Sequence, residues 1–324
     1  MKTSLAAIGS YTPEKILTNA DFEKMVDTSD EWIRTRSGIR ERHIAADDQA
    51  TSDLSVIASK RALEAAHLSP KHVQAIIVAT ATPDMLFPST ACLVQTRIGA
   101  PHVISFDISA GCTGFLYGLA IAESLVKSGY DNILVIGADT LSKITDYTDR
   151  TTCVLFGDGA GAALIKRTEL EDCILSSYFA ADGSSWQLLQ QPGGGSRIPA
   201  SHDSVDKRLH YIKMQGNEVF KLAVRAMSEA ALKTLKKASI STSQIDLLIP
   251  HQANIRIIEA SAKRLHIPAE KVLVNLDRYG NTSAASIPIA LDQAIREGRA
   301  KKGDLILMIA FGAGFTWGGV LLRY

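Results

Sequence analysis

The feature that most constrains the fold is an alternation of apolar, strand-like runs with amphipathic helical patterns, which occurs twice along the chain. In the first half the strand-like runs lie at 74–81, 102–109, 132–139 and 153–166, and helical patterns lie at 52–68 and 114–129. After about residue 170 the order recurs, with helical patterns at 217–238, 255–265 and 283–298 and strand-like runs at 245–251, 271–277, 304–312 and 315–324. The sequence therefore predicts an α/β protein of two stacked, topologically related halves, residues 1–170 and 171–324.

The length and charge of the chain narrow its class. With 324 residues, of which 46% are hydrophobic, it can bury a large core. The formal net charge is +1, so no global field attracts nucleic acid or an anionic membrane. The first residues hold too short an apolar stretch for a signal peptide, and no apolar run of about 18 residues follows. We therefore expect a cytoplasmic protein that binds neither nucleic acid nor membrane.

The cysteines and histidines do not form disulfide or metal motifs. Cys92, Cys112, Cys153 and Cys173 are scattered without CxxC spacing, and no two histidines have HExxH spacing. We therefore expect no disulfide framework and no metal site. Every cysteine except Cys112 is expected to be a small buried side chain.

Two glycine-rich runs do not match a nucleotide site. GDGAGA at 157–162 lies within an apolar strand pattern instead of opening a helix, and PGGGS at 192–196 lacks the lysine of a phosphate loop. The second run belongs to the longest irregular stretch, 182–208, which we expect to form a functional or mobile loop.

One cysteine occupies a position that favours a role as a nucleophile. In SAGCTGFLYG, at 109–118, Cys112 follows a strand-like run and opens a helical pattern. The unpaired N–H groups and the positive end of the helix dipole favour the thiolate there, and a thiolate is the nucleophilic form. Position alone leaves open the alternative that a small residue was needed for close packing. The glycines on both sides favour an exposed nucleophile, because they permit a tight turn.

His251 and Asn281 stand at comparable junctions in the second half. His251 ends the strand-like run LLIPH, and Asn281 precedes a helical pattern in RYGNTSAAS. A lone histidine is more often a structural residue, and an asparagine in this position is more often a helix cap. Sites in α/β sheets collect at the carboxyl ends of strands, so we expect these two side chains and Cys112 to converge.

Two basic segments each admit two interpretations. In TSDEWIRTRSGIRERH, at 28–43, arginines flank Trp32, which suits an adenine ring and its phosphates or simply a solvated helix. In 256–266, Arg256, Lys263 and Arg264 recur at roughly helical spacing, which suits an acidic protein partner or solvent exposure.

The motifs TSDEWIRTRSGIRER, GCTGF, PHQANIRI, GNTSAASIP and AFGAGFTWG occur in this order along the chain. With them the chain resembles the β-ketoacyl-acyl-carrier-protein synthase III family of bacterial fatty-acid synthesis over essentially its full length. The resemblance implies a thiolase-like fold of five αβαβα layers and a homodimer. It also implies a decarboxylative condensation of a short acyl-coenzyme A, expected to be acetyl-coenzyme A, with malonyl-acyl carrier protein, without a cofactor.

The same resemblance implies roles for individual residues. The catalytic triad would be Cys112, His251 and Asn281, with an oxyanion hole formed by the backbone N–H groups of Cys112 and Ala313. Coenzyme A would be held by Thr28, Trp32, Arg36, Arg150, Met214, Gly216, Phe220, Ala223 and Asn254. The acyl carrier protein would contact Gln252, Ala253, Asn254, Ile255, Arg256, Lys263 and Arg264. Phe87 would cross the dimer interface and close the acyl pocket of the partner.

Two residues depart from the family pattern. Gly111 stands where an alanine usually precedes the cysteine, and Ala313 interrupts the glycines of FGAGF. Three other functions remain open: a related condensing enzyme of secondary metabolism, a cysteine hydrolase with a Cys-His-Asn triad, and a non-catalytic module that binds acyl-coenzyme A or carrier protein. The retained triad argues against the last, and the Trp32 and Arg36 segment argues against the hydrolase.

Overall fold

The first half of the molecule is built on a mixed sheet of five strands. A computed structural model describes all residues, 1–324. The strands run in the order β1-β7-β6-β4-β5. Their bounds are β1 (Lys2–Tyr11), β4 (Ala75–Ala79), β5 (Ile104–Ile108), β6 (Ile133–Thr140) and β7 (Asp158–Thr168). The helices of this half are α3 (Thr51–Ala65), α4 (Thr90–Ile98) and α5 (Gly114–Lys127).

The second half repeats this plan. Its sheet has the order β11-β12-β13-β8. The strands are β8 (Ile174–Ala181), β11 (Leu247–Pro250), β12 (Leu305–Gly312) and β13 (Thr316–Arg323), and the helices are α7 (Gly216–Ala238), α8 (Ile255–Arg264) and α10 (Ser286–Arg296). In both sheets the last two strands of the half pair antiparallel, and the first strand pairs antiparallel with the last.

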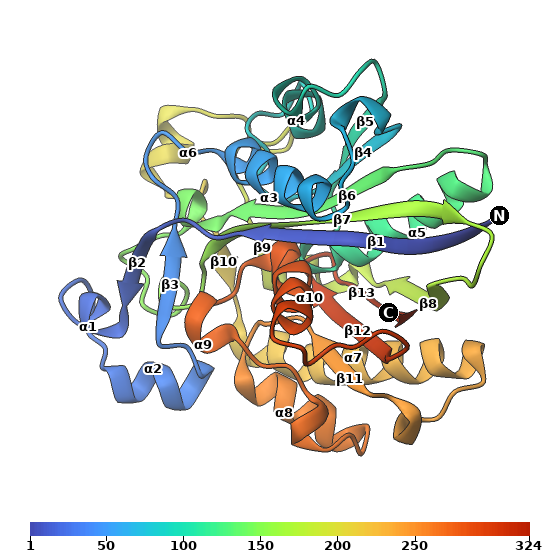
Figure 1. The fold of residues 1–324 in the computed structure, drawn as a ribbon. Coiled ribbons are helices and arrows are strands. Elements are labelled where there is room, and N and C mark those ends of the chain that lie inside the picture. The colour runs from blue at the N-terminus through green and yellow to red at the C-terminus, as the bar shows by residue number, and fades with distance from the viewer.

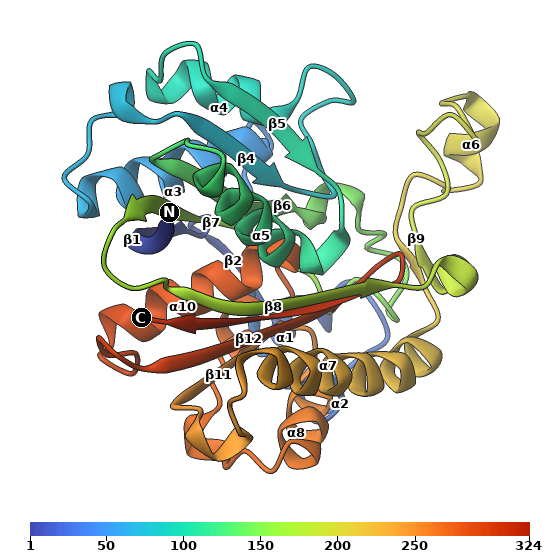
Figure 2. The ribbon, with the colours of Figure 1, turned by 90° about the vertical axis from the view of Figure 1, so that its right-hand side faces the viewer.

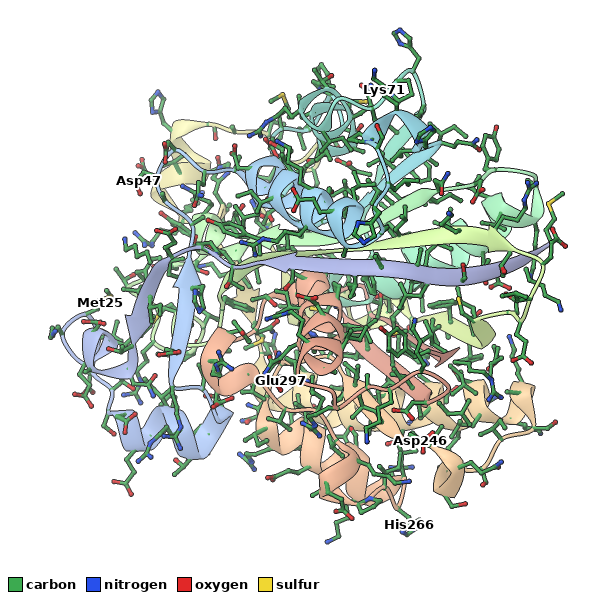
Figure 3. The ribbon with its side chains drawn as sticks, in the orientation of Figure 1. Met25, Asp47, Lys71, Asp246, His266 and Glu297 are labelled. Carbon is green, nitrogen blue, oxygen red and sulfur yellow. The ribbon has the colours of Figure 1, made fainter.

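The two sheets and their helices stack in five layers (Figures 1 and 2). Helices α3 and α4 cover the outer face of the first sheet, α5 and α10 lie between the sheets, and α7 and α8 cover the outer face of the second. Three large apolar clusters fill the spaces between the layers, and the central one joins α5 and α10 to both sheets. Lys71 and His266 mark opposite outer ends of this stack in Figure 3.

The strand expected at 271–277 is not formed, so this prediction is wrong. Only Val272 makes a bridge, parallel to Leu248 of β11, and the chain then enters helix α9 (Leu276–Tyr279). The bridge occupies the place beside β11 that β5 occupies beside β4 in the first sheet. After it, Asn275 donates from its side chain to Gln293, so the chain turns inward toward residue 281 instead of extending.

The strand expected at 153–166 begins later than predicted. Residues 153–156 form turns and one bridge, and β7 starts at Asp158. The displaced residues bond to the other half, because the N–H of Asn281 donates to the carbonyl oxygen of Leu155 at 2.9 Å. This bond brings the turn beside the candidate site.

A small lateral unit precedes the first layered helix. It contains β2 (Lys15–Thr18), α1 (Asn19–Phe22), α2 (Asp30–Ser37) and β3 (Glu41–Ile44), and Met25 lies at its outer edge in Figure 3. The guanidinium of Arg42, which is fully buried, donates to Val154 O and to Asn19 Oδ1. At Gly38, where φ is 86°, an added Cβ would lie 2.7 Å from Ile255 Cβ, so α2 packs closely on the start of α8.

The long irregular stretch holds short elements only. They are a 3₁₀ helix (Gly183–Leu188), β9 (Leu189–Gln190) and α6 (His202–Asp206), and α6 projects from the layered body in Figure 2. Strand β10 (Lys213–Met214), which pairs with β9, follows the stretch. No helix in the structure combines the length and the apolar character that a membrane crossing requires.

Candidate active site

The three candidate catalytic residues line one cavity of about 320 Å³. Cys112 lies in the turn of residues 111–113 between β5 and α5, and His251 directly follows β11. Asn281 precedes the turn of residues 283–285 that leads into α10. Each residue therefore stands at a junction that precedes a helix, and the stacking of the halves brings the three junctions together.

Burial governs the Cys112 thiol. Burial is the main cause that raises the pKa of Cys112 to about 12; the negative charge of Asp139 acts in the same direction, and a hydrogen bond with the Ser283 side chain opposes them. The sequence position predicted the opposite direction, because the start of a helix favours the thiolate. The resting nucleophile is therefore a thiol that must lose its proton during the attack.

The turn that carries Cys112 is in direct backbone contact with residues 312–314. Gly111 has φ of 50°, and an added Cβ there would lie 2.9 Å from Ala313 N. A Cβ at Gly312 would lie 2.5 Å from Cys112 N. Glycine at 111 is thus explained: the left-handed φ and the closeness of Ala313 both disfavour a side chain. The two departures from the family pattern are neighbours in space.

His251 is held as a neutral imidazole. The residue is 2% exposed, and burial lowers the pKa of His251 to about 3. Its Nδ1 shares a hydrogen bond of 2.7 Å with Ser286 Oγ, and the Gln252 N–H also approaches that oxygen, at 3.4 Å. If the Gln252 N–H donates to Ser286 and the hydroxyl donates to Nδ1, the proton of the imidazole resides on Nε2.

Asn281 presents its amide nitrogen as a donor. Its Oδ1 accepts the N–H of Ser283 at 2.9 Å, which fixes the orientation of the side chain. Its own backbone carbonyl accepts the N–H of Gly157 at 3.0 Å, so the residue is also held from the first half. With Oδ1 engaged, Nδ2 is the group available to a ligand.

Most of the residues expected to hold an acyl-coenzyme A line the same cavity. These are Trp32, Arg36, Met214, Gly216, Phe220, Ala223 and Asn254, and they are joined by Ala253 and Arg256. The lining also includes residues that the sequence did not single out: Ile33, Ser37, Thr151, Val154, Leu155, Phe156, Leu189, Asn217, Val219, Met227, Ile257, Phe311 and Gly312. Most of these are apolar, and no sequence signal separates them from core residues.

Basic and aromatic side chains gather at one end of the cavity. The guanidinium of Arg150 lies 5.5 Å from the centroid of the Trp32 ring, and that of Arg256 lies 5.4 Å from the Phe220 ring. Neither Arg150 nor Thr28 lines the cavity itself. The Thr28 hydroxyl is buried without a hydrogen-bond partner.

The remaining candidates lie apart from the cavity. Lys263 and Arg264 are exposed on α8, whose first turn carries the partly buried Ile255. Gln252 is 1% exposed, and its amide donates to Pro250 O and Leu273 O, so it serves the packing of the second half. Phe87, on the loop after β4, is 84% exposed.

The four cysteines differ in exposure. Cys153 and Cys173 are buried as expected, but Cys92 is exposed near the start of α4, so that prediction is wrong. All four cysteines are free thiols. No group of three or more His, Cys, Asp or Glu side chains is arranged to hold a metal ion.

Comparison with known proteins gives a consistent result. One family model, described as 3-oxoacyl-[acyl-carrier-protein (ACP)] synthase III, matches residues 106–183, and the model of its C-terminal part matches residues 235–324. A beta-ketoacyl-[acyl-carrier-protein] synthase III of Caldanaerobacter subterraneus subsp. tengcongensis is 61% identical over 317 residues, which cover 98% of this chain and 96% of that protein.

Solved structures agree with the sequence comparison. The structure of a 3-oxoacyl-[acyl-carrier-protein] synthase III from Aquifex aeolicus has a TM-score of 0.92 and 52% identity, and the match covers 99% of this chain and 100% of that one. The corresponding structure from Thermus thermophilus has a TM-score of 0.93 and 46% identity, with 99% of each chain covered. These likenesses confirm the family resemblance and the thiolase-like fold class that the sequence motifs predicted.

Proposed function

The chain belongs to the 3-oxoacyl-[acyl-carrier-protein] synthase III family and is a condensing acyltransferase, and on this premise we propose the reaction that its cavity performs. A short acyl group, expected to be acetyl, passes from coenzyme A to Cys112 and is then condensed with malonyl-acyl carrier protein. The products are a 3-oxoacyl-carrier protein, coenzyme A and carbon dioxide. The observation that carries this proposal is one cavity that holds a thiol beside two neutral hydrogen-bond donors.

In the first half-reaction the Cys112 sulfur attacks the thioester carbonyl. The backbone N–H groups of Cys112 and Ala313 stabilise the tetrahedral oxyanion. The bond from the acyl carbon to coenzyme A then breaks, and coenzyme A leaves as its thiol. The proton lost by Cys112 balances the proton gained by the leaving group, so the step consumes no other reactant.

In the second half-reaction the two neutral donors act on the malonyl group. With Ser286 bonded to Nδ1, His251 donates from Nε2, and Asn281 donates from Nδ2, to the thioester oxygen of malonyl-carrier protein. Carbon dioxide leaves and an enolate forms, which these donors stabilise because charge develops on that oxygen. The enolate carbon attacks the acyl-cysteine, the bond from the acyl carbon to sulfur breaks, and the departing Cys112 thiolate takes a proton from solvent. No metal or redox cofactor is needed for acyl transfer or decarboxylation.

The basic and aromatic end of the cavity suits coenzyme A. We assign the adenine to the space beside Trp32 and Arg150. The adenine ring would lie between the indole and the guanidinium, and the distance between these two groups would increase to admit it. Arg36 lines the cavity and is available for the phosphates. The Thr28 hydroxyl is buried and does not line the cavity, so the structure does not support its expected contact with coenzyme A. The pantetheine arm would follow Asn254, Met214, Gly216, Phe220 and Ala223 toward the thiol.

Helix α8 supplies the proposed docking surface for the carrier protein. Arg256 in its first turn and Lys263 and Arg264 in its last turn are exposed and carry positive charge. Asn254 caps the helix by accepting the Arg256 N–H, and its Nδ2 donates to Arg36 O, which joins this surface to the cavity wall. Ala253 and Ile255 adjoin these residues, whereas the buried Gln252 is left out of the surface.

We also infer a homodimer. Strand β5 is the free edge of the first sheet, and its side chains are only partly buried. On the loop after β4, Leu86 is 80% exposed and Phe87 is 84% exposed. Exposed apolar side chains beside an unpaired strand edge favour association, and Phe87 would then close the acyl pocket of the partner.

We expect the enzyme in the cytoplasm.

The proposal is tested by following the acyl group. Intact-protein mass measurement after incubation with a panel of acyl-coenzyme A donors is expected to show one added acyl group, which malonyl-carrier protein then removes. Cys112→Ala is expected to gain no mass. Release of free acid without the malonyl acceptor would instead indicate a hydrolase, and no acyl adduct with any donor would indicate a binding module. The donor that loads fastest identifies the primer.

A further inference from the structure

Two threonines connect the turn of residues 110–113 to the turn of residues 312–316. The hydroxyl oxygens of Thr113 and Thr316 lie 2.8 Å apart. Thr113 Oγ1 also lies 2.6 Å from Ala110 O, and Thr316 Oγ1 lies 3.0 Å from the same carbonyl oxygen. Ala313 O is 3.3 Å from Thr316 Oγ1. The hydroxyls therefore meet between the turn that carries the nucleophile and the turn that carries Ala313.

The number of hydroxyl hydrogens limits which of these close contacts can be hydrogen bonds at the same time. Each hydroxyl has one hydrogen to donate and can accept through its lone pairs. If Thr113 donates to Ala110 O, Thr316 can donate to Thr113; if Thr113 donates to Thr316, then Thr316 can donate to Ala110 O. Both arrangements leave at least one hydrogen bond across the gap between the turns, and Thr316 Oγ1 lies closer to these two acceptors, at 2.8 and 3.0 Å, than to Ala313 O of its own turn, at 3.3 Å. Every hydrogen bond that joins the two turns directly passes through these hydroxyls.

The other contacts between the turns are purely steric. Gly111 and Gly312 allow the backbones to touch, since an added Cβ at either position would lie within 3.0 Å of Ala313 N or Cys112 N. Such contacts resist closer approach but do not resist separation. The threonine hydroxyls supply the opposing restraint, so the spacing of the two turns is limited from both sides.

We propose that Thr113 and Thr316 are positioning residues that hold the backbone N–H groups of Cys112 and Ala313 at the separation required by the tetrahedral intermediate. The inference rests on the proposed function, which assigns these two N–H groups to the oxyanion. Thr113 directly follows Cys112 in sequence, and Thr316 is three residues after Ala313. A change in the hydroxyl pair therefore moves the two donors relative to each other without touching the substrate.

The test compares Thr316→Val, which removes every hydrogen bond between the two turns and keeps the shape of the side chain, with Thr316→Ser, which keeps the hydroxyl. Ala110 O keeps two donors in the valine variant, the Thr113 N–H at 3.2 Å and the Thr113 hydroxyl at 2.6 Å. The valine variant is therefore expected to fold. Thr145→Val is the matched control: Thr145 is 3% exposed, donates to Leu141 O at 2.8 Å, and does not line the cavity.

Rapid-quench acylation by acyl-coenzyme A is the measurement. In Thr316→Val the maximal acylation rate is expected to fall by between about tenfold and about a hundredfold, while the acyl-coenzyme A concentration at half-maximal rate stays unchanged. Thr316→Ser and Thr145→Val are expected to keep the full rate. Thr113→Val is expected to lose less than Thr316→Val, because the Thr316 hydroxyl still reaches Ala110 O, and the double variant should lose little more than Thr316→Val.

Three results would overturn the inference: an unchanged rate in Thr316→Val, an equal loss in Thr316→Ser, or an equal loss in Thr145→Val. Additive losses in the double variant would also count against it. Failure of the proposed function has a separate signature, because the unaltered enzyme itself would then form no acyl adduct on Cys112.

Discussion

Replacement of Asn281 by aspartate separates the two half-reactions. Asn281 Oδ1 is held by the N–H of Ser283 at 2.9 Å, and an aspartate oxygen can accept the same bond. The side chain therefore keeps its place, and what changes is the other atom, from an N–H donor to a carboxylate oxygen. Loss of one donor to a developing oxyanion costs about 2.7 to 4 kcal/mol, or about 10² to 10³ in rate. Decarboxylation is expected to slow by at least this factor.

The assay uses an enzyme that has already been acylated at Cys112. Release of carbon dioxide from malonyl-carrier protein is then followed in a single turnover, and the preceding acylation is measured separately by intact mass. Asn281→Asp is expected to acylate at close to the unaltered rate, because the oxyanion of that step is assigned to the backbone N–H groups of Cys112 and Ala313. Asn281→Ala controls for the added charge and should also slow only decarboxylation. Equal losses in both half-reactions would refute the assignment.

Four further predictions concern single groups. Because burial raises the pKa of Cys112 to about 12, alkylation of this thiol by iodoacetamide in a Cys92→Ser background should keep rising from neutral pH to pH 10 without a plateau, which peptide mass measurement can follow. Burial lowers the pKa of His251 to about 3 in the folded protein, so as the pH falls the unfolded chain binds a proton at this residue before the folded chain does. The free energy of unfolding, measured with urea, should therefore fall by about 2 kcal/mol between about pH 6.5 and pH 5 because of His251. His251→Asn should lack this part of the pH dependence. Phe87→Arg should shift the protein toward monomer in sedimentation, whereas the exposed Trp186→Arg should not. Arg256→Ala should raise KM for the carrier protein several-fold and leave the rate of self-acylation unchanged at saturating acyl-coenzyme A.

Most strands of the two sheets follow from periodicity, including the parallel edge strands β5 and β11, but the antiparallel edge strands do not. The buried strands β4, β6 and β12 are continuous apolar runs, so their positions were predicted to within a few residues. Strands β1 and β8 were not predicted. Each lies at the edge of its sheet, and its pairing contains a register shift, between Leu5 and Ala7 for β1 and opposite Leu321 and Leu322 for β8. A bulge breaks the alternation of buried and exposed side chains on which a sequence prediction depends.

Some residues of the candidate site could be predicted from the sequence, and others could not. Polar residues at strand-to-helix junctions are conspicuous in a sequence, which is why Cys112, His251 and Asn281 could be found. The apolar walls are not, because Phe156 and Phe311 have the composition of core residues, and only the stacked halves show that a cavity passes beside them. The contact between Gly111 and Ala313 joins residues about two hundred positions apart and required the structure.

The pKa of Cys112 shows how local and tertiary effects oppose each other at one atom. The start of α5 stabilises negative charge on the sulfur, but its influence is limited to the first turn and is worth at most about 2 kcal/mol in partly buried sites. Removal of the thiolate from water acts in the other direction and raises the pKa of Cys112 to about 12. The thiol and the imidazole of His251 are both neutral at rest, so neither places a net charge beside the carbonyl before the attack. Donors fixed in a site of low polarity act most strongly on charge that develops during the reaction, so the burial that weakens the nucleophile also strengthens the stabilisation of the oxyanion.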